Sequence, residues 1–180
     1  MRKSILLFSL VAIACSMSSC FDNLESHSSP QIMFGNVYVN PQFSGDTLVG
    51  AKDTLYEHFD KEFGHIYLDT MQLGDTAMFS ALFSSEMNNL VNINSVFDTT
   101  RVELWFGIDM ENDKIKQALA SGSNPERGYL NFNPMYNMVT FPISIVPQVA
   151  GTHSIKITVV SDSKYPTTSI RFTVPVSKEL

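Results

Sequence analysis

The chain has 180 residues, of which 44% are hydrophobic and 17% are charged. Its 18 acidic and 12 basic side chains give a formal net charge of −6, and an acidic surface repels phosphate backbones. The composition therefore argues against a nucleic-acid partner. This length suffices for one hydrophobic core, so a single domain is expected.

The first nineteen residues have the parts of a secretory signal peptide. Arg2 and Lys3 form a positive start, an apolar run covers 5–14, and small residues dominate 16–19, directly before Cys20. The run is too short to cross a bilayer, which needs roughly 20 apolar residues. The sequence therefore predicts export and removal of residues 1–19.

The ending Ser18-Ser19-Cys20 resembles the bacterial lipobox, in which the cysteine is acylated and becomes the mature N-terminus. The resemblance implies that Cys20 is the lipid attachment site, and several acyl chains anchor a protein stably to a membrane. Met17 departs from the motif, which prefers Leu there. Two alternatives stay open: acylation of Cys15, or an ordinary secretory signal with an incidental cysteine.

Cleavage before Cys20 has two consequences for the mature chain. It removes two basic residues and no acid, so 10 basic and 18 acidic residues remain and the net charge becomes −8. It also removes Cys15, and acylation of Cys20 leaves no thiol for a disulfide. Stability must then come from packing rather than from covalent cross-links.

Residues 20–30 are polar, rich in serine and end at Pro30, so they predict a flexible tether. From Gln31 to Leu180 we expect a single mostly β domain, because apolar residues alternate with polar ones. The clearest alternation covers 101–108, 139–145, 154–159 and 170–174. Strands with one apolar face each are what two packed sheets require.

Weaker patterns predict further strands at 31–39, 47–56, 63–70, 76–84, 90–97 and 128–133. Pro142 lacks an amide hydrogen, so its strand is predicted to lie at an edge or to carry a bulge. One segment has helical character: residues 112–120 contain good helix formers and place Ile115 and Leu119 four apart. We expect one short inserted helix there.

Short strands with regular turns predict an antiparallel β-sandwich. The last two strands, 151–162 and 166–176, resemble the closing hairpin of immunoglobulin-like domains in bacterial surface proteins, and 76–84 resembles their second strand. With the lipobox and the acidic composition, the chain resembles small lipoproteins of the Bacteroidota.

That resemblance implies a lipid anchor at the outer membrane. In this group, acidic residues just after the cysteine direct proteins to the cell surface. Here Asp22 and Glu25 are not adjacent to each other, so surface and periplasmic display both stay open.

No pattern predicts catalysis, a metal or a cofactor. His153 and Ser154 are neighbours on a predicted strand and point to opposite faces, so they do not form a dyad. Acids alternate at Asp109, Glu111 and Asp113, but a calcium loop would need Gly at Lys114 and Glu at Ala120. We interpret these acids as a solvated loop before a helix N-terminus. His27, His58 and His65 also lack zinc-like spacing.

Trp105 is the residue most suggestive of binding, because alternation puts it on the polar face of its strand. Exposed aromatic rings stack on sugars or pack into partners, and Tyr129 and Tyr136 are predicted to enlarge this surface. In the interpretation that we favour, the 112–120 helix or the N-terminal strands cover Trp105. Two function classes follow: a non-enzymatic module that binds another envelope protein, or a glycan-binding accessory lipoprotein of a polysaccharide uptake system.

Overall fold

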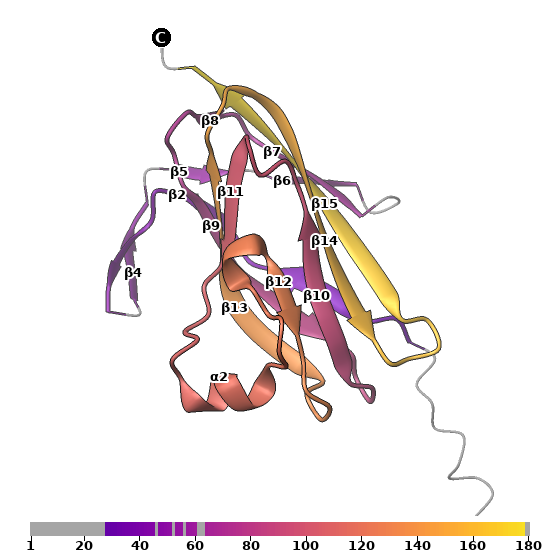
Figure 1. Cartoon of the computed structure of the whole chain (residues 1–180). Helices are drawn as coiled ribbons and strands as arrows, with labels where there is room; N and C mark the ends of the chain where they lie inside the picture. The colour runs from indigo at the N-terminus through magenta and orange to yellow at the C-terminus, as the bar shows by residue number, and fades with distance from the viewer. Residues whose placement is uncertain (1–27, 46, 52, 56, 61–63, 179–180) are drawn as a thin grey trace, which may run out of the picture.

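The structure is a computed structural model that describes residues 28–45, 47–51, 53–55, 57–60 and 64–178. The predicted signal peptide, Cys20 and most of the predicted tether lie outside the described residues. Two sheets pack against each other as an immunoglobulin-like, mostly antiparallel β-sandwich, which confirms the predicted fold class (Figure 1). No helix among the described residues is long and apolar enough to cross a membrane.

The first sheet has six strands in the order β11-β13-β9-β2-β5, with β1 also paired to β9. Its strands are β1 (Gln31–Phe34), β2 (Val37–Val39), β5 (Asp53–Leu55), β9 (Ala77–Ser84), β11 (Val102–Phe106) and β13 (Met138–Pro147). The predicted strand 31–39 is thus two strands, interrupted at Gly35 and Asn36, and both halves pair with β9.

The second sheet has seven strands in the order β12-β10-β14-β15-β7-β6, with β8 also paired to β15. Its strands are β6 (Glu57–Asp60), β7 (His65–Leu68), β8 (Met71–Gln72), β10 (Leu90–Val96), β12 (Tyr129–Asn131), β14 (Gly151–Ser161) and β15 (Thr167–Ser177). β14 and β15 form the predicted closing hairpin, and β15 pairs in parallel with β7 and β8.

The core lies between the two sheets, where alternate residues of each long strand are buried. Aromatic rings join the layers: Phe172 of β15 contacts Phe79 of β9 and Phe34 of β1, with ring centroids 5.1 and 5.7 Å apart. Each such ring removes a large apolar area from water, the main favourable term in folding. The period-two pattern in the sequence therefore reports the buried faces correctly.

Pro142 lies in a central strand, so the prediction of an edge strand or bulge was wrong. β13 pairs with both β9 and β11 without a register shift at this position. The carbonyl of Pro142 accepts a hydrogen bond from the Gly107 amide at 2.7 Å, one residue beyond the end of β11. The missing N–H of Pro142 thus lies at the position where β11 has ended. The hydrogen-bonded pairing of the two strands therefore loses at most one bond at its end.

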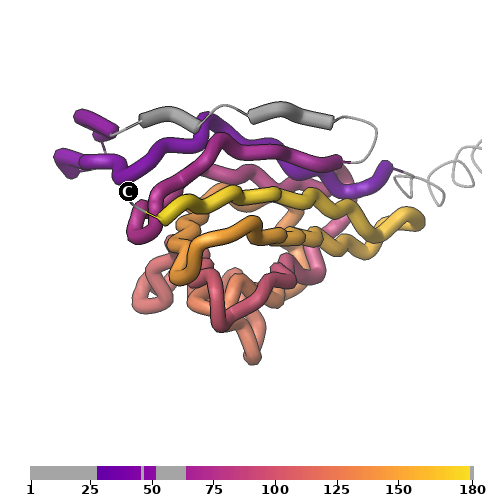
Figure 2. Tube along the Cα trace, turned by 90° about the horizontal axis from the view of Figure 1, so that it is seen from above, coloured from indigo at the N-terminus to yellow at the C-terminus, as the bar shows by residue number. Residues whose placement is uncertain are grey.

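Two segments lie outside the two main sheets. β3 (Gln42–Ser44) and β4 (Thr47–Gly50) form a separate two-stranded sheet. The short helix α2 (Asp113–Ala118) confirms the predicted insertion, with Asn112 as its N-cap. In Figure 2 the N-terminal strands and the segment containing α2 lie on opposite sides of the sandwich.

Candidate functional site

The candidate site lies along β11, which is an edge strand of the first sheet. Val102, Leu104 and Phe106 are buried on the core side, whereas Glu103 is exposed and Trp105 is half-buried on the other side. The predicted alternation of this strand is therefore confirmed. Along its outer side, no second strand pairs with β11 among the described residues.

Hydrogen bonds at both ends of the strand show which backbone groups face outward. Gly107 donates to the Pro142 carbonyl, and Gln148 donates to the Arg101 carbonyl. Odd-numbered residues of β11 therefore bond to β13, because bonded positions alternate in an antiparallel pair. The amide and carbonyl of Leu104 consequently point to the outer side.

A short 3₁₀ helix, η1 (Pro125–Arg127), packs beside this edge. Between β11 and η1 lie two hollows of about 570 and 600 Å³, and Trp105 and Glu126 line both of them. We call the pair the β11 groove. Its remaining lining residues are Phe97, Thr99, Val102, Glu103, Leu104, Phe106, Gly107, Ile108, Met110, Ser123, Asn124, Pro125 and Arg127.

The surroundings of Trp105 differ from those that the favoured interpretation expects. Residues of η1 line the hollows beside it, whereas no residue of α2 or of the described N-terminal strands does. Helix α2 has no buried residue, and Ile115 on it is only half-buried. Residues 123–127, which the sequence presents only as a polar loop with one proline, lie across the groove from the tryptophan instead.

Gly128 holds η1 against the sandwich. Its φ is +61°, and a Cβ at this position would overlap Ser95 Oγ and lie 2.6 Å from Leu104 Cδ2. The Ser95 hydroxyl donates to the Gly128 carbonyl at 3.0 Å. Only glycine allows both the left-handed backbone and this close approach. The position of η1, which forms one wall of the β11 groove, therefore depends on a glycine at residue 128.

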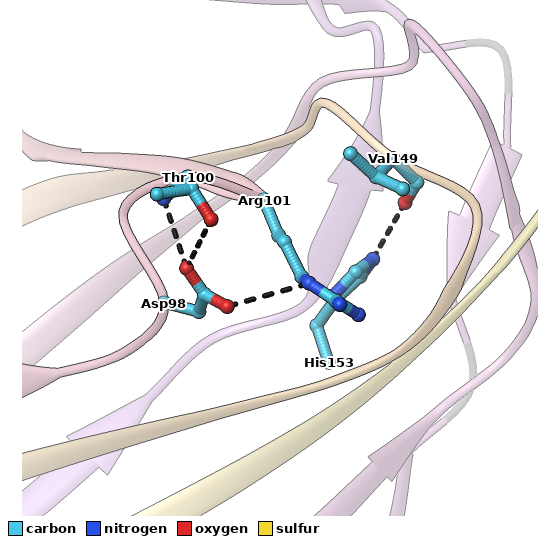
Figure 3. Close-up of polar contacts among 5 residues, drawn as sticks. All are labelled: Asp98, Thr100, Arg101, Val149 and His153. Carbon is cyan, nitrogen blue, oxygen red and sulfur yellow. Dashed lines mark hydrogen bonds and ion pairs between the residues drawn. The ribbon is translucent and has the colours of Figure 1, made fainter.

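A tight turn closes the start of β11 (Figure 3). Asp98 Oδ1 accepts hydrogen bonds from the Thr100 hydroxyl at 2.6 Å and the Thr100 amide at 2.9 Å, and Asp98 Oδ2 lies 3.4 Å from Arg101 Nε. These two Thr100 bonds lower the pKa of Asp98, with smaller contributions from the charges of Arg101 and His153. The Asp98 side chain thus stabilises the turn that leads into β11.

His153 is buried near this turn, and its Nε2 lies 2.6 Å from the Val149 carbonyl oxygen. Ser154 is exposed on the opposite face of β14, as the strand alternation predicted. The two side chains do not form a dyad. The interpretation of His153 as a hydrogen-bonded residue near the strand start is confirmed.

The structure does not bring the two tyrosines to Trp105. Tyr129 lies on β12, in the second sheet, and its hydroxyl donates to Asn131 Oδ1 at 2.8 Å. Tyr136 lies in the turn before β13, where its carbonyl accepts from the Leu90 amide at 2.7 Å. Neither lines the β11 groove, so the predicted aromatic surface reduces to Trp105, with Phe97 at one end of the groove.

The polar side chains before α2 mainly accept hydrogen bonds from nearby backbone amides. Asp109 accepts from the Glu111 amide, Asn112 accepts from the Lys114 amide, and Glu111 pairs with Lys116 at 3.2 Å. No group of three or more histidine, cysteine or acidic side chains within the described part of the chain is arranged to hold a metal ion. The interpretation as a loop leading into a helix agrees with these contacts.

The groove combines apolar walls with a few charges. Glu103 lines it from β11, and Glu126 and Arg127 line it from η1, whereas its described lining includes no histidine or cysteine. Sequence reasoning missed Glu126 and Arg127. The only signal for their role was Pro125, whose fixed φ suits the first position of a helical turn.

Comparisons with known proteins found only distant likenesses. No family model and no curated protein matches the chain. Among solved structures, a family 123 glycoside hydrolase from Clostridium perfringens is similar over 85% of this chain and 28% of its own, with 10% identity and a TM-score of 0.43. The chain thus spans about a quarter of that enzyme's length.

Two further solved structures cover more of their own chains. A PapD-like domain of human CEP192 is 14% identical, with a TM-score of 0.37, over 78% of this chain and 100% of its own. AggA, the major subunit of aggregative adherence fimbriae from Escherichia coli, is 11% identical, with a TM-score of 0.28, over 84% and 99%. Likenesses this distant carry no argument about activity or partner.

Proposed function

We propose that the chain is a lipid-anchored cell-envelope lipoprotein, held at the outer membrane through Cys20, which binds a partner protein without catalysis. The proposal for the anchor rests on the sequence before Cys20. The proposal for binding rests on one observation: β11 is an edge strand, and its half-buried Trp105 lines a groove along that edge.

The chemistry of the groove favours a polypeptide as its ligand. Outward-pointing amides and carbonyls of an edge strand pair best with another extended backbone, and side-chain pockets next to that edge give selectivity. Trp105 supplies a large rigid contact area of the kind that dominates binding energy in interfaces. Two glutamates and one arginine along the lining favour a segment with at least one basic side chain.

A photo-cross-linking residue at the groove tests this proposal in intact cells. Placed at Glu103, it should yield a discrete cross-linked protein, and the additional substitution Trp105→Ala should abolish that product. The same cross-linker at Ser154, which is exposed on the other sheet, is the matched control. Equal products from both positions, or none from either, would contradict the proposal.

Glycan binding is the second candidate, because part of the indole ring is open to solvent. Wild-type protein and the Trp105→Ala variant are compared by their retention in gels containing polysaccharide. Retention of the wild type that the variant loses would favour a glycan ligand over a polypeptide. Absence of retention by the wild type would count against it.

The anchor is tested separately with globomycin, which blocks cleavage of lipoprotein signal peptides. A larger precursor should accumulate in treated cells, and a Cys20→Ser variant should lose its acyl mass. Processing that is insensitive to the drug would contradict the anchor.

A further inference from the structure

Three turns gather at the end of the sandwich where the described chain begins. They are residues 85–89 between β9 and β10, 133–137 between β12 and β13, and 162–166 between β14 and β15 (Figure 1, lower end). Ser28 lies at this end, and its hydroxyl donates to Glu86 Oε2 at 2.9 Å. We call these three turns the tether-end rim.

Side-chain hydrogen bonds hold the rim together. The backbone amide and Nδ2 of Asn89 donate to the two carboxylate oxygens of Asp162, at 2.7 and 2.8 Å. Asn89 Oδ1 accepts from the Met135 amide at 3.0 Å, and Asn137 Nδ2 donates to the Glu86 carbonyl at 2.7 Å. One asparagine therefore links all three turns, and the rim is an ordered surface.

This ordered surface carries apolar side chains that point into solvent. Met135 is 88% exposed and Met87 69%, the two largest values among the exposed large hydrophobic residues of the described chain. Met138, at 61%, and Tyr165, at 55%, lie on the same rim or directly next to it. Methionine side chains are flexible and adapt to irregular apolar surroundings.

The backbone at Met135 gives an independent indication that this side chain has a role. Its φ is +95°, a region that L residues other than asparagine and aspartate rarely adopt. Turn chemistry alone would select glycine or asparagine there. A strained position that carries a largely exposed apolar side chain indicates a function for that side chain.

The geometry points to a lipid bilayer as the surface that the rim contacts, an inference that rests on the proposed anchor at Cys20. Eight residue-to-residue steps lead from Cys20 to Ser28, and an extended chain spans at most about 3.6 Å per step, or roughly 29 Å. The opposite end of the sandwich is the full length of β14 away, eleven residues or about 37 Å. The tether-end rim is therefore the end that the anchor holds next to the membrane.

The charges at the rim indicate the kind of contact. Lys164 precedes Tyr165, whereas Glu86 and Asp162 carry the opposite charge and both accept hydrogen bonds within the rim. With charges of both signs present, attraction to anionic lipid is not the main term. We expect the methionine tips and Tyr165 to enter the boundary between head groups and acyl chains, as apolar side chains of interfacial segments do.

Spin labels on single cysteines measure this contact. In the acylated protein the Cys20 thiol is used in a thioether, so Met87→Cys, Met135→Cys and the control Val96→Cys each provide one free thiol. Val96 is exposed at the far end of β10. The labelled proteins are placed on vesicles of phosphatidylethanolamine and phosphatidylglycerol, and collisions with oxygen and with a water-soluble nickel chelate are recorded.

Labels at 87 and 135 should collide with the nickel chelate at least about threefold less often than the label at 96, and more often with oxygen, because they lie within the interface. A second variant separates folding from docking. Met135→Asn suits the positive φ, so with the label at 87 it should keep or raise Tm while the label moves toward water.

The outcomes distinguish this inference from the proposal beneath it. If the protein purified from cell membranes does not float with vesicles, the anchor itself fails and the inference falls with it. If the protein floats but labels at 87 and 135 are as accessible to nickel as the label at 96, membrane contact is overturned and the anchor stands. That second result would also be obtained if a protein partner, rather than lipid, covers the rim in cells.

Discussion

Two segments leave the main sheets, and they relate to the core in different ways. Residues 107–128 return to the sandwich: Pro125 and Gly128 are buried, and η1 forms one wall of the β11 groove. By contrast, β3 (Gln42–Ser44) and β4 (Thr47–Gly50) form a hairpin whose strands pair only with each other among the described residues, and all residues of β3 are exposed. We therefore expect the segment whose residues are buried against the sandwich to contribute more to the free energy of unfolding than the hairpin does.

Alanine substitutions at one leucine near each segment should give the largest difference in the free energy of unfolding. Leu104 is buried on β11 under Gly128, whereas Leu48 is half-buried on β4. Leu104→Ala should lower the free energy of unfolding by about 3 kcal/mol through lost burial and a cavity. Leu48→Ala should cost less than about 1 kcal/mol. Urea denaturation measures both, and equal losses would show that the hairpin shares the core.

A glycine pair gives an intermediate difference. Gly128 and Gly45 have φ values of +61° and +59°, but nothing lies within 4 Å of a Cβ built at Gly45. Both alanine variants should lose about 1 kcal/mol from the left-handed backbone. Gly128→Ala should lose about 1–2 kcal/mol more, because its methyl group meets Ser95 and Leu104. Similar unfolding midpoints for the two variants would contradict the packing of η1 described above.

The smallest expected effect concerns pH at the turn that precedes β11. Hydrogen bonds from Thr100 lower the pKa of Asp98 below its ordinary value of 3.8 in the folded protein. A lowered folded-state pKa contributes stability that is present above the unfolded-state pKa and is lost as pH falls through the folded-state value.

An Asp98→Asn variant checks this sign. Wild-type protein should lose slightly more stability than the variant when the pH is lowered from about 5 to below about 4. Thermal unfolding at both pH values measures the difference, and the hairpin variant Phe43→Ser is the control that should keep the wild-type pH dependence. An identical pH dependence in Asp98→Asn would show that other carboxylates dominate.

Alternation predicted the strands because burial on one face leaves a period of two in the sequence. It placed Leu104 inside, Trp105 outside and His153 away from Ser154, and these assignments are confirmed. Pro142 misled the prediction, because a missing amide matters only where a neighbouring strand continues. Whether the neighbouring strand continues depends on where β11 ends, and the sequence around Pro142 does not contain that information.

The surroundings of Trp105 could not be predicted from its own strand. The residues that line the groove with it include Pro125 and Glu126, some twenty residues further along the chain, in a loop without periodicity. The helix 112–120 was the more attractive candidate because a helical pattern is visible in sequence and a 3₁₀ turn is not. The separation of Tyr129 from Trp105 likewise depends on which sheet each strand joins, and alternation does not carry that information.

The direction in which β1 leaves the sandwich has a mechanical consequence. β1 pairs antiparallel with β9 from Gln31 to Phe34, and Gln31 is opposite Ser84, next to the rim, so tension from the tether enters this pair at its rim end. A pull on the tether loads the hydrogen bonds of this pair in shear, all together, rather than opening them one after another. A partner bound at β11 and an anchor at the N-terminus would thus apply tension along the strands. This is the direction in which a sheet resists force best.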